Sequence, residues 1–245
     1  MKKLSTSFAF AVISLASAAP LAAQDGYFFG APHVSLTLRA GAAGPAANGI
    51  LFQTITEQLT LDRSDFVTGT FGAEVAVRAL PRVDVFLNVA TSHSSDRSEF
   101  RDFVETNDEP IRQTTELTRT PLTGGLKLHL LPRGRSISRY AFVPNRFSPY
   151  VGGGAGVMWW ELKQDGDFVD FETMDIFTDH LEESGTAFTA NAFAGGDIWV
   201  APRIGINVEG RYNWADSNLV SYAYSDFEKI DLKGWQLTAG ITFRY

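Results

Sequence analysis

Apolar and polar residues alternate with a period of two along most of the chain, which is the pattern of strands with two different faces. In the first such segment, Val34, Leu36 and Leu38 alternate with polar neighbours. Equivalent alternation recurs after it, bounded by proline and glycine turn signals. We therefore expect eight strands, near residues 34–39, 67–78, 83–90, 124–130, 147–160, 187–200, 204–211 and 234–245.

The connections between these segments also alternate, between long and short. Long stretches follow the first, third, fifth and seventh segments, whereas Leu80-Pro81-Arg82 and Ala201-Pro202 follow the second and sixth. Four long outer loops with short inner turns are typical of transmembrane barrels. Residues 131–146 break the pattern with an arginine-rich insert on the turn side, for which the alternation offers no account. Residues 50–61 alternate weakly, and we interpret them as an extension of the first hairpin above the membrane.

Aromatic residues gather at both ends of the predicted strands. A barrel that crosses a bilayer carries such girdles at its two water interfaces. We expect girdle positions at Phe66, Tyr150, Trp159, Trp199, Tyr212, Trp214, Trp235, Phe243 and Tyr245. Period alone does not say which face points inward, so a soluble lipocalin-like barrel with an apolar interior is the alternative. The two aromatic bands favour the membrane barrel.

The N-terminal residues predict export. Lys2 and Lys3 precede an apolar run from Leu4 to Leu15, and small residues follow. This is the pattern of a signal peptide, and the run is too short to span a bilayer as a helix. We place cleavage after Ala23, so that residues 24–245 form the mature barrel domain with its four long extracellular loops.

Charge and composition narrow the class of partner. The chain has 21 basic and 28 acidic residues and no cysteine. Without residues 1–23, 19 basic and 28 acidic residues remain, a formal charge of −9. An acidic protein is a poor partner for nucleic acid, which needs a basic face. The absence of cysteine excludes thiol chemistry and cysteine-based metal sites.

Three segments carry a family resemblance. The residues from Ser148 to Gly156, the run Glu209-Gly210-Arg211-Tyr212 and the closing residues from Gly234 to Tyr245 resemble small outer-membrane β-barrels of the OmpA-like and OmpW-like kind. The resemblance implies an all-β fold, an eight-stranded antiparallel up-and-down barrel in the outer membrane of a Gram-negative-type bacterium. It also implies contact with outer-membrane lipid and lipopolysaccharide.

The same resemblance implies a role for the final strand. In this family a C-terminal aromatic residue, usually Phe, is recognised by the barrel-assembly machinery, and here the residue is Tyr245. The fold itself says little about function, because one fold hosts many functions.

Charged residues lie on the polar parity of the strands, which would point into the lumen. We expect a lumen charge network of Arg39, Glu74, Arg78, Asp84, Lys127, Asp197, Glu209, Arg211 and Arg244. Eight strands leave a lumen just wide enough for side chains, and unpaired charges there would be costly. We therefore predict a paired, plugged interior, with Glu209 bound to Arg211 or Arg39. A gated ion path through the network is the alternative.

Small residues on the fifth segment predict how aromatic side chains fill the interior. Gly152, Gly154 and Gly156 share one face and leave space opposite. We expect Phe86, Met158 and Phe193 to fill that space.

The third long loop is strongly acidic. Its carboxylates are Asp165, Asp167, Asp170, Glu172, Asp175, Asp179, Glu182 and Glu183, against Lys163 alone. Such a loop could hold a divalent cation or bridge to lipopolysaccharide through one. The spacing matches no calcium-loop pattern, so a solvated loop is the favoured interpretation and no metal site is assigned.

One short motif raises the question of catalysis. His93-Ser94-Ser95, with Glu99 or Glu105, could form an acyl-transfer triad similar to that of outer-membrane lipid A deacylases. The match is two residues long and lies on an earlier strand than in that family. We therefore expect no enzyme and assign no catalytic residue.

The expected function follows from these points. We predict a monomeric structural or surface-interaction protein without a cofactor, acting through its extracellular loops. The alternative is a narrow channel for ions or small apolar molecules, as OmpW-like relatives are thought to be. A lipid A-modifying acyl hydrolase is the third hypothesis.

Overall fold

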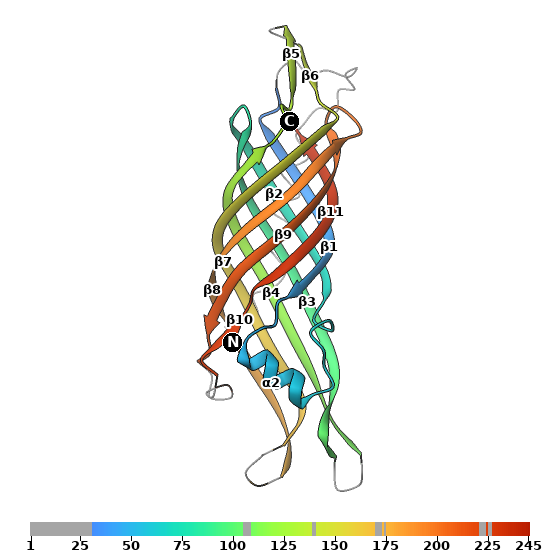
Figure 1. Ribbon diagram of the computed structural model, residues 1–245, viewed down its shortest axis with the longest axis vertical. Coiled ribbons are helices and arrows are strands. Elements are labelled where there is room, and N and C mark those ends of the chain that lie inside the picture. Colours follow the sequence, from blue (N-terminus) through green and yellow to red (C-terminus); the bar gives the residue numbers. More distant parts are fainter. Residues whose placement is uncertain are drawn as a thin grey trace, which may run out of the picture.

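The computed structural model describes residues 31–104, 109–138, 141–169, 173, 175–220, 224 and 227–245. The predicted signal peptide lies outside these residues. Strands make up most of the described chain (Figure 1). The elements are β1 (Val34–Pro45), α2 (Ile50–Gln58), β2 (Thr68–Leu80), β3 (Val83–Val104), β4 (Pro110–His129), β5 (Gly134–Ser138), β6 (Ala141–Pro144), β7 (Phe147–Val169), β8 (Ile176–Trp199), β9 (Ile204–Asn218), β10 (Lys229–Asp231) and β11 (Gly234–Arg244).

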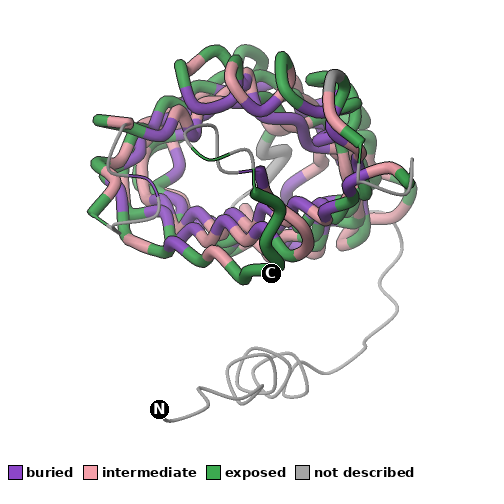
Figure 2. The backbone as a smooth tube through the Cα atoms, turned by 90° about the horizontal axis from the view of Figure 1, so that it is seen from below, coloured by how far each residue is buried: buried purple, intermediate pink, exposed green. Residues whose placement is uncertain are grey.

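Eight of these strands close into a ring. The order is β1-β2-β3-β4-β7-β8-β9-β11, and every neighbouring pair is antiparallel. The first and last strands of the ring pair from Ser35 with Arg244 to Pro45 with Gly234. Figure 2 looks along the resulting cylinder. The predicted eight-stranded antiparallel barrel is confirmed, and closure leaves the ring without an unpaired edge.

The two faces of the wall have opposite chemistry. On β9, Ile204, Ile206 and Val208 are exposed, whereas Asn207 and Glu209 are buried. The same contrast runs around the ring, with apolar side chains outside and polar side chains inside. This arrangement excludes the soluble barrel with an apolar interior, which would reverse the two faces.

The two ends of the barrel differ. At one end lie the β2–β3 and β8–β9 turns, the end of β11 and a small hairpin of β5 and β6 (Figure 1). We call this the turn end. The insert at residues 131–146 is this hairpin, in which Gly134 pairs with Pro144. The opposite end, which carries the other connections, is the long-loop end.

At the long-loop end, one side of the wall continues far beyond the ring. The last pair of β2 with β3 joins Thr70 to Ser92, and the last pair of β8 with β9 joins Thr189 to Ala215. Beyond these pairs β3, β4, β7 and β8 remain paired with one another as a four-stranded protruding sheet. Residues 93–104 of β3 add about 40 Å of strand at ~3.3 Å per residue. The long hairpins form the lower part of Figure 1.

The interpretation of residues 50–61 as an extended hairpin is wrong. Residues 50–58 form the helix α2, which lies against the inner side of the long-loop end (Figure 1). Leu51, Phe52 and Ile55 are its buried residues, spaced so that one helical face collects them. No helix of the described part of the chain combines the length and the hydrophobicity needed to cross a membrane.

Three of the predicted girdle residues point inward instead. Phe66 packs edge-on against Phe52, with ring centroids 5.5 Å apart. Tyr150 is 1% exposed and shares the inward parity of Ser148, and Trp199 shares that of Asp197. The reason is that position along a strand fixes only the depth of a residue, whereas parity fixes the face.

The other predicted girdle residues lie on the outward parity. Trp159, Trp214 and Trp235 stand near the long-loop end, and each is at least 40% exposed. Tyr212 packs beside Trp214, with ring centroids 5.0 Å apart. Phe243 and Tyr245 close the turn end on the outside, where Phe147 is also exposed.

Candidate functional site

The middle of the lumen holds a compact cluster of five charged side chains, which we call the central network. Arg39 on β1 lies 2.7 Å from Glu74 on β2 and 2.7 Å from Glu209 on β9. Arg211 lies 2.9 Å from Glu209 and 3.3 Å from Glu74. Lys127 on β4 also donates a hydrogen bond to Glu74. Both predicted pairings of Glu209 are present, and the network ties together four strands of the ring.

Aromatic and amide groups hold the central network in place. The Tyr150 hydroxyl donates to Glu209 Oε2 at 2.9 Å and accepts from Asn207 Nδ2 at 2.8 Å. The Lys127 ammonium lies 4.3 Å from the centroid of the Tyr150 ring, and the Arg211 guanidinium lies 4.5 Å from that of Phe193. Such cation–π contacts gain strength where water is excluded.

The glycines of β7 make room for these rings. A Cβ placed on Gly152 would lie 2.3 Å from the Phe193 ring, and one on Gly154 would lie 3.0 Å from the Phe86 ring. The prediction that aromatic rings fill this space is therefore confirmed for Phe86 and Phe193. Met158 instead joins an apolar cluster nearer the long-loop end.

The central network is almost completely buried. Its side chains are 1–5% exposed. It contains three cations and two carboxylates, so every carboxylate has more than one cationic partner. Buried charges in such an arrangement are costly to separate, since removal of one partner leaves another uncompensated. The side chains that lie in the lumen at this level thus hold one another in position.

An apolar cluster lies at the long-loop end, and we call it the lid. Leu51, Phe52 and Ile55 of α2 pack with Leu59 and Phe66 in one apolar cluster. The cluster continues onto the inner wall of the barrel and onto the β9–β11 connection. Those members include Leu117, Met158, Trp160, Leu162, Ala187, Ala215, Tyr224, Ile230 and Leu232.

Hydrogen bonds at the rim fix the lid to the protruding sheet. Leu59 pairs with Phe100, and the backbone N–H of Thr60 donates to the Glu99 carbonyl at 2.8 Å. On the other side, the Tyr224 hydroxyl donates to Gln164 Oε1 at 3.0 Å. Burial and the nearby Glu183 carboxylate raise the pKa of Tyr224, so the phenol stays a neutral donor.

A polar layer separates the lid from the central network. Asn191 pairs in register with Asn213, between the Phe193–Arg211 pair and the Thr189–Ala215 pair. Asn191 is 4% exposed, and neither its amide nitrogen nor its amide oxygen has a hydrogen-bond partner among the described residues. The layer therefore lies between an apolar cluster and a charged one.

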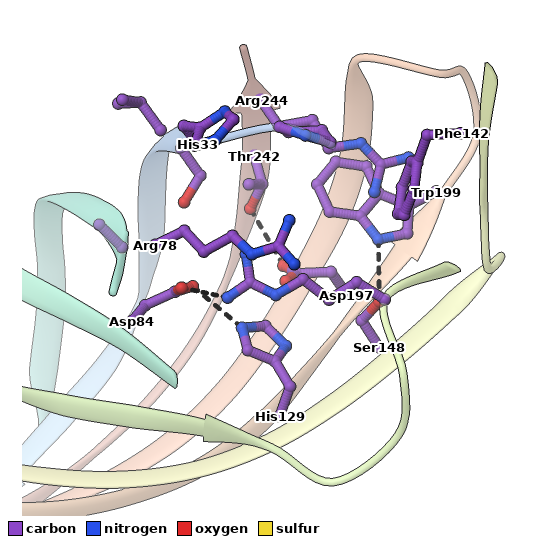
Figure 3. Close-up of a pocket in the computed structure, with 15 residues that line it drawn as sticks. His33, Arg78, Asp84, His129, Phe142, Ser148, Asp197, Trp199, Thr242 and Arg244 are labelled. Carbon is purple, nitrogen blue, oxygen red and sulfur yellow. Dashed lines mark hydrogen bonds and ion pairs between the residues drawn. The ribbon is translucent and has the colours of Figure 1, made fainter. Parts of the chain in front are cut away.

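At the turn end the lumen forms a small pocket (Figure 3). On one wall, Asp84 Oδ2 lies 3.0 Å from His129 Nε2, and Arg133 from the insert donates to Asp84 Oδ1. Phe142 of β6 also lines the pocket and is 6% exposed. The hairpin insert, unexplained by the sequence, thus contributes two lining residues.

The opposite wall of this turn-end pocket is built on Asp197 and Trp199. Asp197 Oδ1 accepts from Asn207 Nδ2 at 2.8 Å and from Thr242 Oγ1 at 3.1 Å. The Trp199 indole N–H donates to Ser148 Oγ at 3.2 Å. The Arg244 guanidinium stacks 3.4 Å from the centroid of the Trp199 ring.

The predicted lumen charges are therefore divided between two sites. Five of them form the central network, whereas Arg78, Asp84, Asp197 and Arg244 line the turn-end pocket. The prediction missed Tyr150, Asn207, His129 and Arg133 as members of these sites. Parity on the strands would have found His129, which shares a face with Lys127, but no local signal marks Arg133, which lies in an insert.

The acidic third loop forms part of the protruding sheet. His180 on β8 contacts Asp165 on β7 and lies 3.5 Å from Glu182. The hydrogen bond and charge of Asp165, with a further contribution from Glu182, raise the pKa of His180. Asp170 and Glu172 lie outside the described residues. Within the described part of the chain, no group of three potential metal ligands was found.

The residues of the hypothetical triad are not assembled as a triad. His93 Nδ1 lies 2.9 Å from Thr118 Oγ1 on the outer face, whereas Ser94 is buried on the inner face. Ser95 donates to Glu116, and Glu99 forms an ion pair with Arg112. Glu105 lies outside the described residues.

Comparison with known proteins gives the following matches. A family model described as "Outer membrane protein beta-barrel domain" matches residues 8–243. The chain is similar to the solved structure of Neisserial surface protein A, with 10% identity, TM-score 0.43, and coverage of 86% of this chain and 97% of that one. For Outer Membrane Protein W of E. coli, the identity is 16% and the TM-score 0.38, and the match covers 88% of this chain and 98% of that one. For a major outer membrane protein of Thermus thermophilus, the identity is 12% and the TM-score 0.46, and the match covers 88% of this chain and 100% of that one. No curated protein matches the sequence.

Proposed function

The chain belongs to the outer membrane β-barrel domain family, and on that premise we propose that it is a barrel closed to solutes that acts through its surface loops. In this proposal the long-loop end faces the cell exterior and the turn end faces the periplasm, as in other such barrels. We propose that the barrel is a monomer, whose closed ring needs no strand from a second chain. Its final strand β11, with the Tyr245 that follows it, is the segment that the assembly machinery recognises.

The observation that carries the proposal is the double obstruction of the lumen. A solute entering from outside meets the apolar lid first and the central network second. The lid is apolar and the central network is charged. A change of ionic strength, or the addition of an apolar ligand, would therefore not remove both obstructions at once. An eight-stranded lumen has little space beyond its own side chains.

The protruding sheet supplies the surface for interaction. It stands clear of the ring and carries exposed carboxylates, including Asp165 and Asp179. It also exposes Phe177, which stacks on Phe168 with ring centroids 5.9 Å apart. A rigid, acidic surface of this kind suits basic partners or cation-bridged lipopolysaccharide, which would approach by electrostatic attraction.

Single-channel recording in a planar bilayer tests the closed lumen. Refolded protein, shown to be folded by its heat-modifiable migration in gels, is expected to insert and remain silent. Steady openings under the same conditions would contradict the proposal and favour the narrow channel. The alternative channel requires both the lid and the central network to move.

A shortened hairpin tests the surface role. Replacement of residues 165–180 by Asn-Gly joins Gln164 to Leu181, which already pair in register, through a favoured two-residue turn. The full chain and the shortened variant are placed in zwitterionic nanodiscs, and the binding of polylysine to each is measured. Binding should be weaker for the shortened variant. Equal binding by both proteins would argue against this sheet as the interaction surface.

We infer no acyl-hydrolase activity, since His93 is bonded to Thr118 rather than to a serine. Lipid A from cells that express the chain should have an unchanged mass spectrum. Loss of an acyl chain that depends on His93 would reverse this inference.

A further inference from the structure

Positive charge is concentrated at the turn end of this acidic protein. Among the described residues, the acidic side chains at this end are Asp84 and Asp197. The arginines there come from β2, the β2–β3 turn, the insert, the β8–β9 turn and β11. They are Arg78, Arg82, Arg133, Arg135, Arg146, Arg203 and Arg244. The excess of cations at this end is opposite in sign to the net charge of the chain.

Three of these arginines line the turn-end pocket and approach it from separate parts of the chain. Arg78 comes from the end of β2 and Arg244 from the end of β11 (Figure 3). Arg133 comes from the insert. Both oxygens of Asp84 are already engaged by His129 and Arg133. No ion pair joins the Arg78 side chain to another described residue.

Buried nitrogens in the pocket lack partners. His129 is 5% exposed, and its Nδ1 has no hydrogen-bond partner among the described residues. The Nε of Arg133 is also buried and unpartnered. The Arg133 N–H is a permanent donor, and His129 Nδ1 becomes a donor when the ring binds a second proton, so both nitrogens suit an acceptor that carries negative charge.

We propose that the turn-end pocket, through Arg78, Arg133 and His129, binds the phosphate group of a small anion or of an anionic lipid. This site lies at the opposite end of the barrel from the proposed interaction surface and is independent of it.

The chemistry of the pocket fits phosphate. Guanidinium groups bind phosphate with paired, charge-assisted hydrogen bonds. The cavity volume is about 30 Å³, which suits one small group rather than a large ligand. The apolar rings of Phe142 and Trp199 line the cavity and reduce the access of water, which strengthens charge-assisted contacts. The stack of Arg244 on Trp199 and the bond of Trp199 to Ser148 hold this wall in a fixed geometry.

Isothermal titration of the folded full chain with inorganic phosphate tests the site. In a neutral detergent, with chloride used to keep the ionic strength constant, we expect saturable binding of one phosphate per chain. Arg78→Gln should weaken binding at least tenfold, because one charge-assisted hydrogen bond is worth roughly that factor or more. Arg133→Gln should act in the same direction.

Arg112→Gln is the matched control, since this arginine forms an exposed ion pair at the long-loop end. It should bind phosphate like the natural chain. Heat-modifiable migration shows that each variant is folded, and Arg78→Gln serves if Arg133→Gln fails to fold. Absence of saturable binding, or an equal loss in Arg112→Gln, would overturn the proposal.

The source of the phosphate group is distinguished by lipid. The titration is repeated in nanodiscs of phosphatidylcholine alone and with added phosphatidylglycerol. Weaker apparent phosphate binding in the presence of phosphatidylglycerol, absent in Arg78→Gln, identifies the lipid headgroup as the occupant. Unchanged binding identifies a soluble phosphate compound.

Discussion

At the scale of single residues, Glu74 shows how the interior is held. Its two carboxylate oxygens are contacted by Arg39, Lys127 and Arg211, and its side chain is 1% exposed. Glu209 is the only other carboxylate of the central network. The position of each charge in this network therefore depends on the others.

Loss of the Glu74 charge should destabilise the barrel. In Glu74→Gln, three buried cations would face Glu209 alone. We expect a loss of ~3–5 kcal/mol in the free energy of unfolding, as for other buried pairs that lose one partner. Urea unfolding in detergent micelles, followed by tryptophan fluorescence, measures it.

Glu99→Gln provides the control for that measurement. Glu99 pairs with Arg112 at 3.0 Å, but these side chains are 45% and 69% exposed. Such pairs contribute roughly 0–1 kcal/mol. If the two substitutions had equal effects, the central network would not be the stabilising unit described above.

His180 gives a prediction on pH. Asp165 and Glu182 raise its pKa above the ordinary value of about 6.5. Because the folded pKa is raised, the stabilising contribution of the charged imidazole is fully present below the unfolded pKa. It is lost as pH rises through the folded pKa.

NMR titration of the imidazole signals measures this shift. Asp165→Asn should lower the pKa of His180, whereas Asp175→Asn should leave it unchanged. A His180 pKa at or below the ordinary value in the natural chain would show that the contact with Asp165 does not form.

Whether a side chain points inward or outward is predictable from its parity, that is, from its odd or even position along the strand. The inward charges and the partners of Glu209 follow from alternation on β1, β2, β4 and β9. Tyr150 and Trp199 were misplaced because their depth was read without their parity. The joining of Arg133 to Asp84 depends on how the insert folds, and no periodic pattern encodes that contact.

At the scale of elements, the strands were predictable inside the membrane and less so outside it. Alternation is strong where one face contacts lipid and the other contacts the lumen. Beyond Ser92 both faces of β3 leave the lipid, so polar residues such as His93 and Ser94 occur on either parity. The protruding sheet therefore extends well past the predicted ends of its strands.

The helix α2 was missed for a related reason. It has nine residues, and five of them are polar. In so short a segment, apolar residues two positions apart fit one face of a strand almost as well as apolar residues four positions apart fit one face of a helix. Its burial against the barrel wall decides the outcome, and that wall is assembled from distant parts of the chain.

Phe52 tests the lid as an element. It is fully buried against Phe66, so Phe52→Ala removes a large ring from the cluster. We expect the opening free energy of the lid to fall by ~3–5 kcal/mol, as for other buried aromatic truncations. Hydrogen exchange of the α2 amides measures this local opening.

Gln53→Ala is the matched substitution on the exposed face of the same helix. It should leave the exchange of the α2 amides nearly unchanged. Equal acceleration in both variants would show that α2 is not held by its apolar face.

At the scale of the whole molecule, the barrel has three different levels along its axis. An apolar lid lies at the long-loop end, a salt-bridged network crosses the middle, and a cationic pocket lies at the turn end. The family and the number of strands could be predicted from the sequence. The order of these levels was not, because it depends on which loop folds into which mouth.

Thiol labelling between the two obstructions measures the closure of the lumen. The chain has no cysteine, so one introduced cysteine is a unique probe. Asn191→Cys places it in the polar layer between the lid and the central network, and Thr178→Cys places it on the exposed protruding sheet. With folded protein in nanodiscs and a bulky, membrane-impermeant maleimide, we expect rapid labelling at residue 178 and none at residue 191 until the barrel is unfolded. Labelling of the two positions at similar rates in the folded barrel would contradict a closed lumen.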